Sequence, residues 1–115
     1  MQDEMIVWPA VIRHHEAAEL IYIEDESGWN NDESAHACVY DEVDMLIDST
    51  GQIFSLDTCK NARVIPVKRH KTIPLLEFLG LVKAHVAQTG ACCVAKLYAP
   101  NLCEAFKVVA STQEH

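Results

Sequence analysis

Residues 43–56 of this 115-residue chain read Val-Asp-Met-Leu-Ile-Asp-Ser-Thr-Gly-Gln-Ile-Phe-Ser-Leu. Two β-rich runs, residues 43–48 and 52–56, flank the short segment Ser49-Thr50-Gly51. Gly51 can adopt the positive φ that a three- or four-residue hairpin loop requires. The stretch therefore predicts a β-hairpin, around which the rest of a sheet can be placed.

Further β-rich runs lie on both sides of this hairpin. Residues 5–12 are apolar on both alternating faces, which is typical of a strand, and Pro9 lacks an N–H and so favours an edge position. A polar break separates this run from residues 19–24, at a spacing that predicts a second hairpin. Residues 62–67 form another short β-branched run, and residues 92–98 are a further candidate strand.

Two helices are predicted in the C-terminal part of the chain. Pro74 stands where a helix would begin, and apolar residues then recur at spacings of three, four and seven up to Gly90. This pattern predicts a helix over about residues 74–89, and a second stripe of the same spacing predicts another over about 100–110. Residues 25–35 concentrate turn-forming and charged residues instead, and predict a long loop.

These segments together predict an α+β fold in a single domain spanning residues 1–115. An antiparallel or mixed sheet, formed mainly by residues 5–67, packs against the two C-terminal helices at about 74–89 and 100–110. A chain of this length buries about two-thirds of its surface on folding. Neither a metal nor a disulfide is therefore needed to hold the core, while the order of the strands is not readable from the sequence.

The composition excludes several kinds of partner. The formal net charge is −8, which repels the phosphate groups of nucleic acids. Asp3 and Glu4 stand where a signal peptide needs positive charge, and no apolar run approaches the roughly 18 residues that span a bilayer. The five cysteines are odd in number and form no CxxC pair, which favours reduced thiols. We expect a cytoplasmic protein that contacts neither nucleic acid nor membrane.

Charge is segregated along the chain in a way that predicts a partner-binding surface. Residues 14–59 hold twelve Asp and Glu and no Lys or Arg, whereas residues 60–71 hold five basic residues. A single tryptophan lies in the predicted acidic loop, where it can anchor a partner or fold back into the core. The alternative to a binding surface is a solvated acidic loop beside a solvated basic loop without a binding function. Exposed ion pairs between such loops contribute only about 0–1 kcal/mol each to stability. The candidate partner-binding residues are Trp29, Asp32, Glu33, Lys68, Arg69 and Lys71.

A second class of function is a small ligand- or metal-binding protein, with or without an enzymatic activity. The candidate metal ligands are His36, Cys38, Cys59 and His70, since imidazole and thiolate are the donors that zinc prefers. Their spacing matches no standard metal motif. The sequence also lacks the Walker A, GxSxG and GxGxxG motifs. No catalytic residue and no cofactor are therefore predicted.

Three segments are similar to segments of a known family. They are Met5-Ile-Val-Trp-Pro-Ala10, Leu46-Ile-Asp-Ser-Thr-Gly-Gln-Ile-Phe54 and Leu97-Tyr-Ala-Pro-Asn-Leu-Cys-Glu-Ala-Phe106. The chain resembles a small domain-of-unknown-function family of soluble bacterial proteins over most of its length. The resemblance implies a strand, a hairpin and a helix start, and it implies no established activity, cofactor or catalytic residue.

The function that we expect is a non-enzymatic protein-interaction or regulatory module whose partner is another protein. The chain acts as a monomer or as a homodimer in this interpretation. In the dimer, an edge strand at residues 5–12 would pair with its twin, although Pro9 disfavours continuous pairing.

Overall fold

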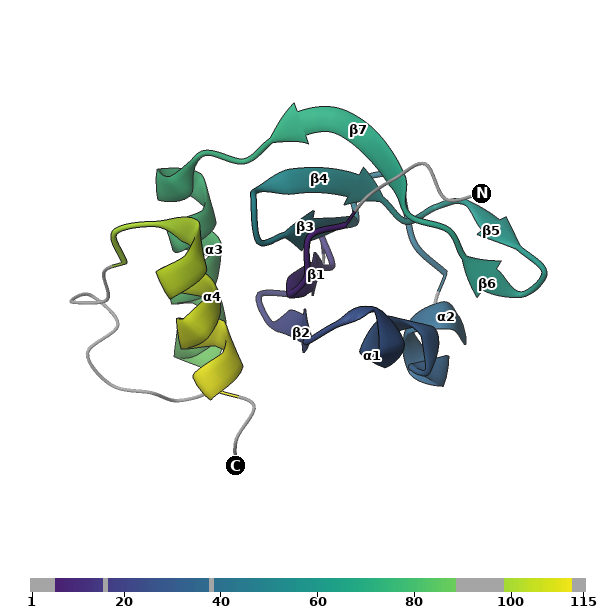
Figure 1. The fold of residues 1–115 in the computed structure, drawn as a ribbon, viewed down its shortest axis with the longest axis horizontal. Helices are drawn as coiled ribbons and strands as arrows, with labels where there is room; N and C mark the ends of the chain where they lie inside the picture. Colours follow the sequence, from purple (N-terminus) through teal and green to yellow (C-terminus); the bar gives the residue numbers. More distant parts are fainter. Residues whose placement is uncertain (1–5, 16, 38, 89–98, 113–115) are drawn as a thin grey trace.

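A computed structural model describes residues 6–15, 17–37, 39–88 and 99–112 of the chain. The elements in chain order are β1 (Ala10–Arg13), β2 (Leu20–Ile23), α1 (Glu26–Asn30), α2 (Glu33–Ala37), β3 (Met45–Asp48), β4 (Gln52–Ser55), β5 (Cys59–Lys60), β6 (Arg63–Val64), β7 (Val67–Thr72), α3 (Leu75–Gln88) and α4 (Leu102–Ser111). Five strands form one sheet in the order β2-β1-β3-β4-β7, and β5 and β6 form a separate hairpin (Figure 1). This architecture confirms the predicted α+β fold.

The two predicted hairpins are confirmed, and every strand pair is antiparallel. β3 and β4 are the two runs quoted above, and Gly51 between them has a φ of 89°, which favours glycine. A Cβ atom at Gly51 would lie 3.0 Å from the side chain of Leu102, so the turn also packs against the start of α4. β1 and β2 form the second hairpin.

The prediction that residues 5–12 form an edge strand is wrong. β1 begins at Ala10 and is hydrogen-bonded to β2 on one side and to β3 on the other. Pro9 lies just before the strand, where its missing N–H removes no bond of the ladder. Since both edges of β1 are occupied, this strand cannot pair with a second copy in the way that we predicted. Among the residues that the structure describes, β2 and β7 form the edges of the sheet.

The sheet is covered on both faces. Figure 1 shows α3 and α4 at one side of the sheet and α1, α2 and the β5–β6 hairpin at the other. Val11 of β1 belongs to the core cluster that contains Phe78 and Phe106 of the two long helices. Its neighbour Ile12 belongs to the cluster that contains Trp29. Successive residues of a strand point to opposite faces, which explains why Ala10, Val11 and Ile12 are all apolar.

The predicted loop at residues 25–35 is wrong, because this segment holds α1 and most of α2. The Oδ1 atom of Asp25 accepts a hydrogen bond from the N–H of Gly28 at 2.8 Å. In the same way Asp32 accepts one from the N–H of Ala35 at 3.0 Å. The aspartates that are typical of turns are here the caps of two short helices.

The sheet extends beyond residue 67, where the sequence predicts its last strand to end. Residues 62–67 are divided between β6 and the start of β7, and β7 continues through the basic cluster to Thr72. The register between β4 and β7 shifts along their length, and His70 has a positive φ of 59° in this region. An irregular edge strand with charged side chains resists pairing with other chains.

Both predicted C-terminal helices are confirmed as α3 and α4. The side chain of Asn101 caps α4 by accepting the N–H of Glu104 at 2.9 Å. Phe78 and Phe106 stack with their ring centroids 4.9 Å apart and join the two helices. The candidate strand at residues 92–98 lies outside the described residues. In the part of the chain that the structure describes, no helix is long and apolar enough to cross a membrane.

A buried histidine links α3 to the sheet and to the end of α4. The Nδ1 atom of His85 accepts the N–H of Leu20 at 2.9 Å. Its Nε2 atom lies 2.8 Å from the hydroxyl of Thr112, which itself donates to the carbonyl of Val109. His85 is therefore neutral, with its proton on Nε2. Burial lowers the pKa of His85 below its ordinary value, and the charge of Glu19 offsets part of this effect.

We expect the free energy of unfolding to fall as the pH drops below about 6.5, the ordinary pKa of histidine. The unfolded chain takes up a proton at His85 before the folded chain does, so acid favours unfolding. Urea unfolding at several pH values between about 7.5 and 5 measures how the free energy of unfolding depends on pH. His85→Gln does not titrate and should give a flatter profile. Equal slopes for the two proteins would assign the pH dependence to other groups.

Candidate functional site

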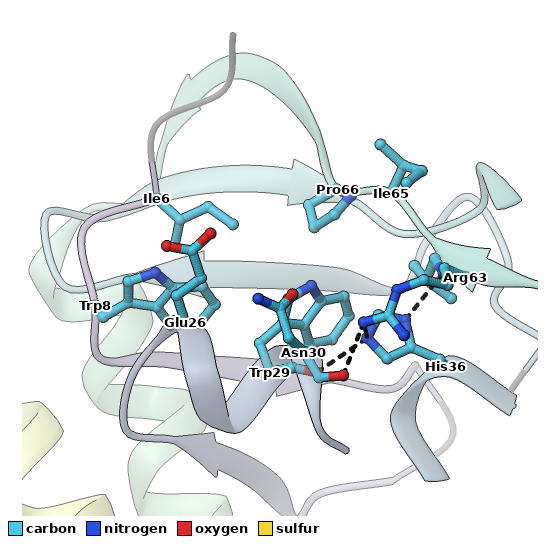
Figure 2. A pocket seen from close by; sticks show the side chains of 10 residues that line it. Ile6, Trp8, Glu26, Trp29, Asn30, His36, Arg63, Ile65 and Pro66 are labelled. Carbon is cyan, nitrogen blue, oxygen red and sulfur yellow. Dashed lines mark hydrogen bonds between the residues drawn. The ribbon is translucent and has the colours of Figure 1, made fainter. Parts of the chain in front are cut away.

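A pocket of about 210 Å³ opens between the segment before β1, helix α1 and the chain that follows β6 (Figure 2). Trp8 and Trp29 supply its aromatic lining, and Ile6, Ile65 and Pro66 supply further apolar surface. Its polar lining comes from Glu26, Asn30, His36 and Arg63. The pocket therefore combines two indole rings with a carboxylate, an amide and a guanidinium.

His36 of α2 holds the inner wall of this pocket together. Its Nδ1 atom accepts the backbone N–H of Val64 at 3.0 Å, and its Nε2 atom donates to the carbonyl of Trp29 at 2.9 Å. The imidazole ring also packs against the Trp29 indole, with 4.4 Å between the ring centroids. One buried side chain thus joins α1, α2 and β6. Both ring nitrogens are used by the main chain, and the ring is the neutral tautomer with its proton on Nε2.

Arg63 of β6 stands beside His36 at the rim. Its Nη2 atom donates to the carbonyl of Asn30 at 2.8 Å, at the last residue of α1. The end of a helix carries partial negative charge, which favours a guanidinium there. The 3.1 Å approach of Nη2 to His36 is no hydrogen bond in this tautomer, since the Nε2 proton points to the Trp29 carbonyl. Among the described residues, no carboxylate forms an ion pair with Arg63.

The charges of the pocket are separated. Figure 2 shows the Glu26 carboxylate near Ile6 and Trp8 at one end of the pocket and the Arg63 guanidinium beside His36 at the other. The side chain of Trp29 lies between them. Aromatic rings bind apolar groups, whereas a guanidinium forms charge-assisted hydrogen bonds with carboxylates. The arrangement suits an occupant with an apolar body and a carboxylate at one end.

The predicted partner-binding residues of the acidic segment have three different roles. Trp29 is 5% exposed and belongs to the core, although its ring still lines the pocket. Asp32 uses its side chain to cap α2, and Glu33 is exposed in the first turn of that helix. Of the three, Trp29 is thus the residue that the fold places at the pocket.

The predicted partner-binding residues of the basic segment all lie on the edge strand β7. Lys68 and Arg69 are half-buried, and Lys71 is exposed. Arg69 donates a hydrogen bond to the backbone carbonyl of Glu42. Arg63 also meets a backbone carbonyl of the acidic segment, so the two oppositely charged segments touch through main-chain oxygens at these positions and not through carboxylates.

The four predicted metal ligands do not form a shared site in the described residues. His36 uses both ring nitrogens as described above, Cys59 is an exposed free cysteine, and His70 is exposed on β7. Cys38 lies outside the described residues. Within the described ranges, three potential ligand atoms come within 4.8 Å of one another at a different place, formed by His15, Asp41 and Asp44.

This other cluster is built around the buried carboxylate of Asp44, which is 2% exposed. Asp44 accepts hydrogen bonds at 2.8 Å from the backbone N–H and the Nδ1 atom of His15 and from the backbone N–H of Asp41. Nδ1 of His14, whose ring stacks on Tyr40, lies 3.6 Å from the second oxygen. Burial raises the pKa of Asp44, but the hydrogen bonds from His15 and Asp41 and the nearby His14 outweigh it and lower the pKa to about 2.

Sequence reasoning missed this cluster because its members are far apart in the chain. His14 and His15 directly follow β1, and Asp44 directly precedes β3. The antiparallel pairing of β1 with β3 sets Arg13 opposite Met45, and so brings the two polar ends together. The sequence shows only that polar residues flank two β-rich runs. These residues can be assigned to one site only when the pairing of the two strands is known.

A family model matches residues 8–109 of the chain, and that family, DUF4144, is described as a protein structure with unknown function. The chain belongs to the DUF4144 family. This membership confirms the predicted resemblance to a family of unknown function. The DUF4144 chain is also similar to a solved structure described as the NMR structure of the protein from Shewanella amazonensis, with 22% identity and a TM-score of 0.68. That likeness covers 96% of this chain and 93% of the other, and it shows the fold alone. None of the curated proteins matches this chain.

Proposed function

We propose that this DUF4144 protein is a non-enzymatic protein-interaction module that holds a short segment of a partner protein in the pocket between Trp8 and Trp29. The observation that carries the proposal is the pocket's Arg63, which forms no ion pair with a carboxylate of the described residues. A guanidinium beside aromatic surface is typical of the residues that dominate binding energy at protein interfaces.

The size of the pocket favours a side chain over a small-molecule ligand. Its volume of about 210 Å³ is below the roughly 300–1,000 Å³ of typical ligand sites. Its histidine, His36, is engaged by the main chain through both nitrogens, which favours a structural role over that of a catalytic base. Ile65 is 37% exposed beside the pocket and extends its apolar surface.

The separated charges define the partner segment. In this proposal, an apolar residue of the partner lies between Trp8 and Trp29. An acidic group of the partner pairs with Arg63, and a basic group of the partner faces Glu26. Asp32 and Glu33 attract the basic flank of the partner, while the β7 residues Lys68, Arg69 and Lys71 attract its acidic flank. Such peripheral charges raise the rate of association more than the affinity. We place this interaction in the cytoplasm, with the protein a monomer or a homodimer.

A charge-swap selection tests the proposal. Random peptides displayed on phage are selected on the full-length wild type, on Arg63→Glu and on Glu26→Lys. The wild type should enrich peptides with an apolar residue between a basic and an acidic one. Arg63→Glu should bind those peptides about tenfold more weakly or worse, and should select basic residues at the formerly acidic position. Trp fluorescence reports the binding of each purified peptide.

Lys83→Glu is the matched control, since it makes the same charge change on α3, away from the pocket. It should select the same peptides as the wild type. Enrichment of the same peptides by wild type and Arg63→Glu, or no enrichment on a wild type that is folded, would overturn the proposal.

A further inference from the structure

The imidazole of His15 and the carboxylate of Asp41 are spaced as two ligands of one metal ion. The Nε2 atom of His15 lies 3.5 Å from an Asp41 carboxylate oxygen. A tetrahedral zinc ion with bonds of about 2.0–2.2 Å holds neighbouring ligand atoms about 3.4 Å apart. The spacing of these two atoms therefore matches that of two ligands of one tetrahedral ion.

Asp44 fixes the orientation of His15 from the other side of the ring. Its Oδ1 atom accepts a hydrogen bond from the Nδ1 atom of His15 at 2.8 Å, which directs Nε2 toward Asp41. Asp44 is itself held by the backbone N–H groups of His15 and Asp41, and it is buried. A carboxylate that supports a histidine in this way is the usual second shell of a metal-binding imidazole.

We propose that His15 and Asp41 bind a divalent transition-metal ion such as zinc, with Asp44 as the residue that orients His15. Imidazole selects zinc and its neighbours over magnesium and calcium, which prefer oxygen ligands alone. Two protein ligands leave two of the four tetrahedral positions of zinc for water. The site lies at the ends of β1 and β3 and is separate from the pocket of Trp8 and Trp29.

The charge of the cluster agrees with a bound cation. Two carboxylates, Asp41 and Asp44, meet around one imidazole, and His14 adds a second imidazole to Asp44 alone. A divalent ion neutralises the two carboxylates. The competing explanation is a protonated His15 that lies between the two aspartates and binds no metal. The two explanations differ in whether zinc binds and in which residues it requires.

The test uses zinc and the reduced, untagged full-length protein with Cys59 and Cys103 replaced by serine, because both are exposed thiols. Calorimetry at about pH 7.5, above the ordinary pKa of imidazole of about 6.5, should give one zinc ion per chain. Amide NMR signals should shift around His15 and Asp41. His15→Gln and Asp41→Asn should each weaken zinc binding about tenfold or more, and Asp44→Asn by about 10–100-fold.

The matched controls are His70→Gln and Asp57→Asn, which replace an exposed histidine and an exposed aspartate elsewhere. Both should bind zinc as the parent protein does. Asp41 has a side chain that is 67% exposed, so Asp41→Asn should keep the fold and remains informative if His15→Gln does not. Absence of binding at millimolar zinc, shifts centred on other residues, or unchanged affinity in Asp41→Asn would each overturn the proposal.

Discussion

Asp48→Ala should lower the free energy of unfolding by about 3–5 kcal/mol, the largest effect of any polar substitution that we expect in this protein. The Asp48 carboxylate ends β3, is fully buried, and accepts five hydrogen bonds of 2.7–3.0 Å. They come from the backbone of Val7 and from the backbone and side chains of Thr50 and Gln52. Alanine leaves these donors without their acceptor in the turn that joins β3 to β4.

Urea unfolding followed by far-UV circular dichroism measures this loss of free energy. The slope of the unfolding free energy against urea concentration should not change if the folded state keeps its compactness. Asp48→Asn retains one acceptor oxygen and should lose less stability than Asp48→Ala. Asp57→Ala removes an exposed carboxylate from the same acidic segment and should stay within about 0.5 kcal/mol of the wild type. If Asp48→Ala matched Asp57→Ala, the carboxylate network would have no role in stability.

His36→Ala should lower the free energy of unfolding by about 2–5 kcal/mol, because a buried main-chain donor loses its acceptor, at about 1–3 kcal/mol, and a buried ring is truncated. That donor is the N–H of Val64, whereas the carbonyl of Trp29 loses the Nε2 donor of His36 but keeps the N–H of Asp32 at 3.3 Å. The substitution also removes the ring that packs against Trp29. We expect the β5–β6 hairpin to loosen against α1, and the peptides selected on the wild type to lose most of their affinity.

His36→Gln distinguishes the hydrogen bonds from the packing. Its amide oxygen can accept the N–H of Val64 and its amide nitrogen can donate to a carbonyl, so it should recover part of the stability that alanine loses. Thermal and urea unfolding give the stability, and amide hydrogen exchange at Val64 reports the local opening. A loss below about 1 kcal/mol in His36→Ala would show that this bridge does not hold the pocket together.

The elements that the sequence predicted correctly have local causes. Gly51 supplies the positive φ of its turn, and Asp48 binds that turn through residues only two and four positions away. The helices α3 and α4 follow from apolar stripes at helical spacing. The family of unknown function was likewise predicted from segments that lead into β1, span this hairpin and include the start of α4.

The elements that the sequence predicted wrongly depend on neighbours in space. Asp25 and Asp32 are as typical of turns as of helix caps, and the five-residue helices α1 and α2 bury Trp29 and Ala35 against the sheet. A helix this short is not stable without such packing. The basic residues after Val67 form a strand because β4 offers an edge to which they can bind.

Local chemistry along the chain thus determines the hairpins, the long helices and the polar residues that flank the strands, since turns, caps and apolar periodicity act over a few residues. Tertiary structure alone decides which of these polar residues meet. The placement of β1 between β2 and β3 joins His15 to Asp41 and Asp44, and the packing of α2 against β6 sets Trp29 and Arg63 in one pocket. The order of the strands and the packing of the layers follow from the burial of apolar surface across the whole fold. No single segment of the sequence is sufficient to predict them.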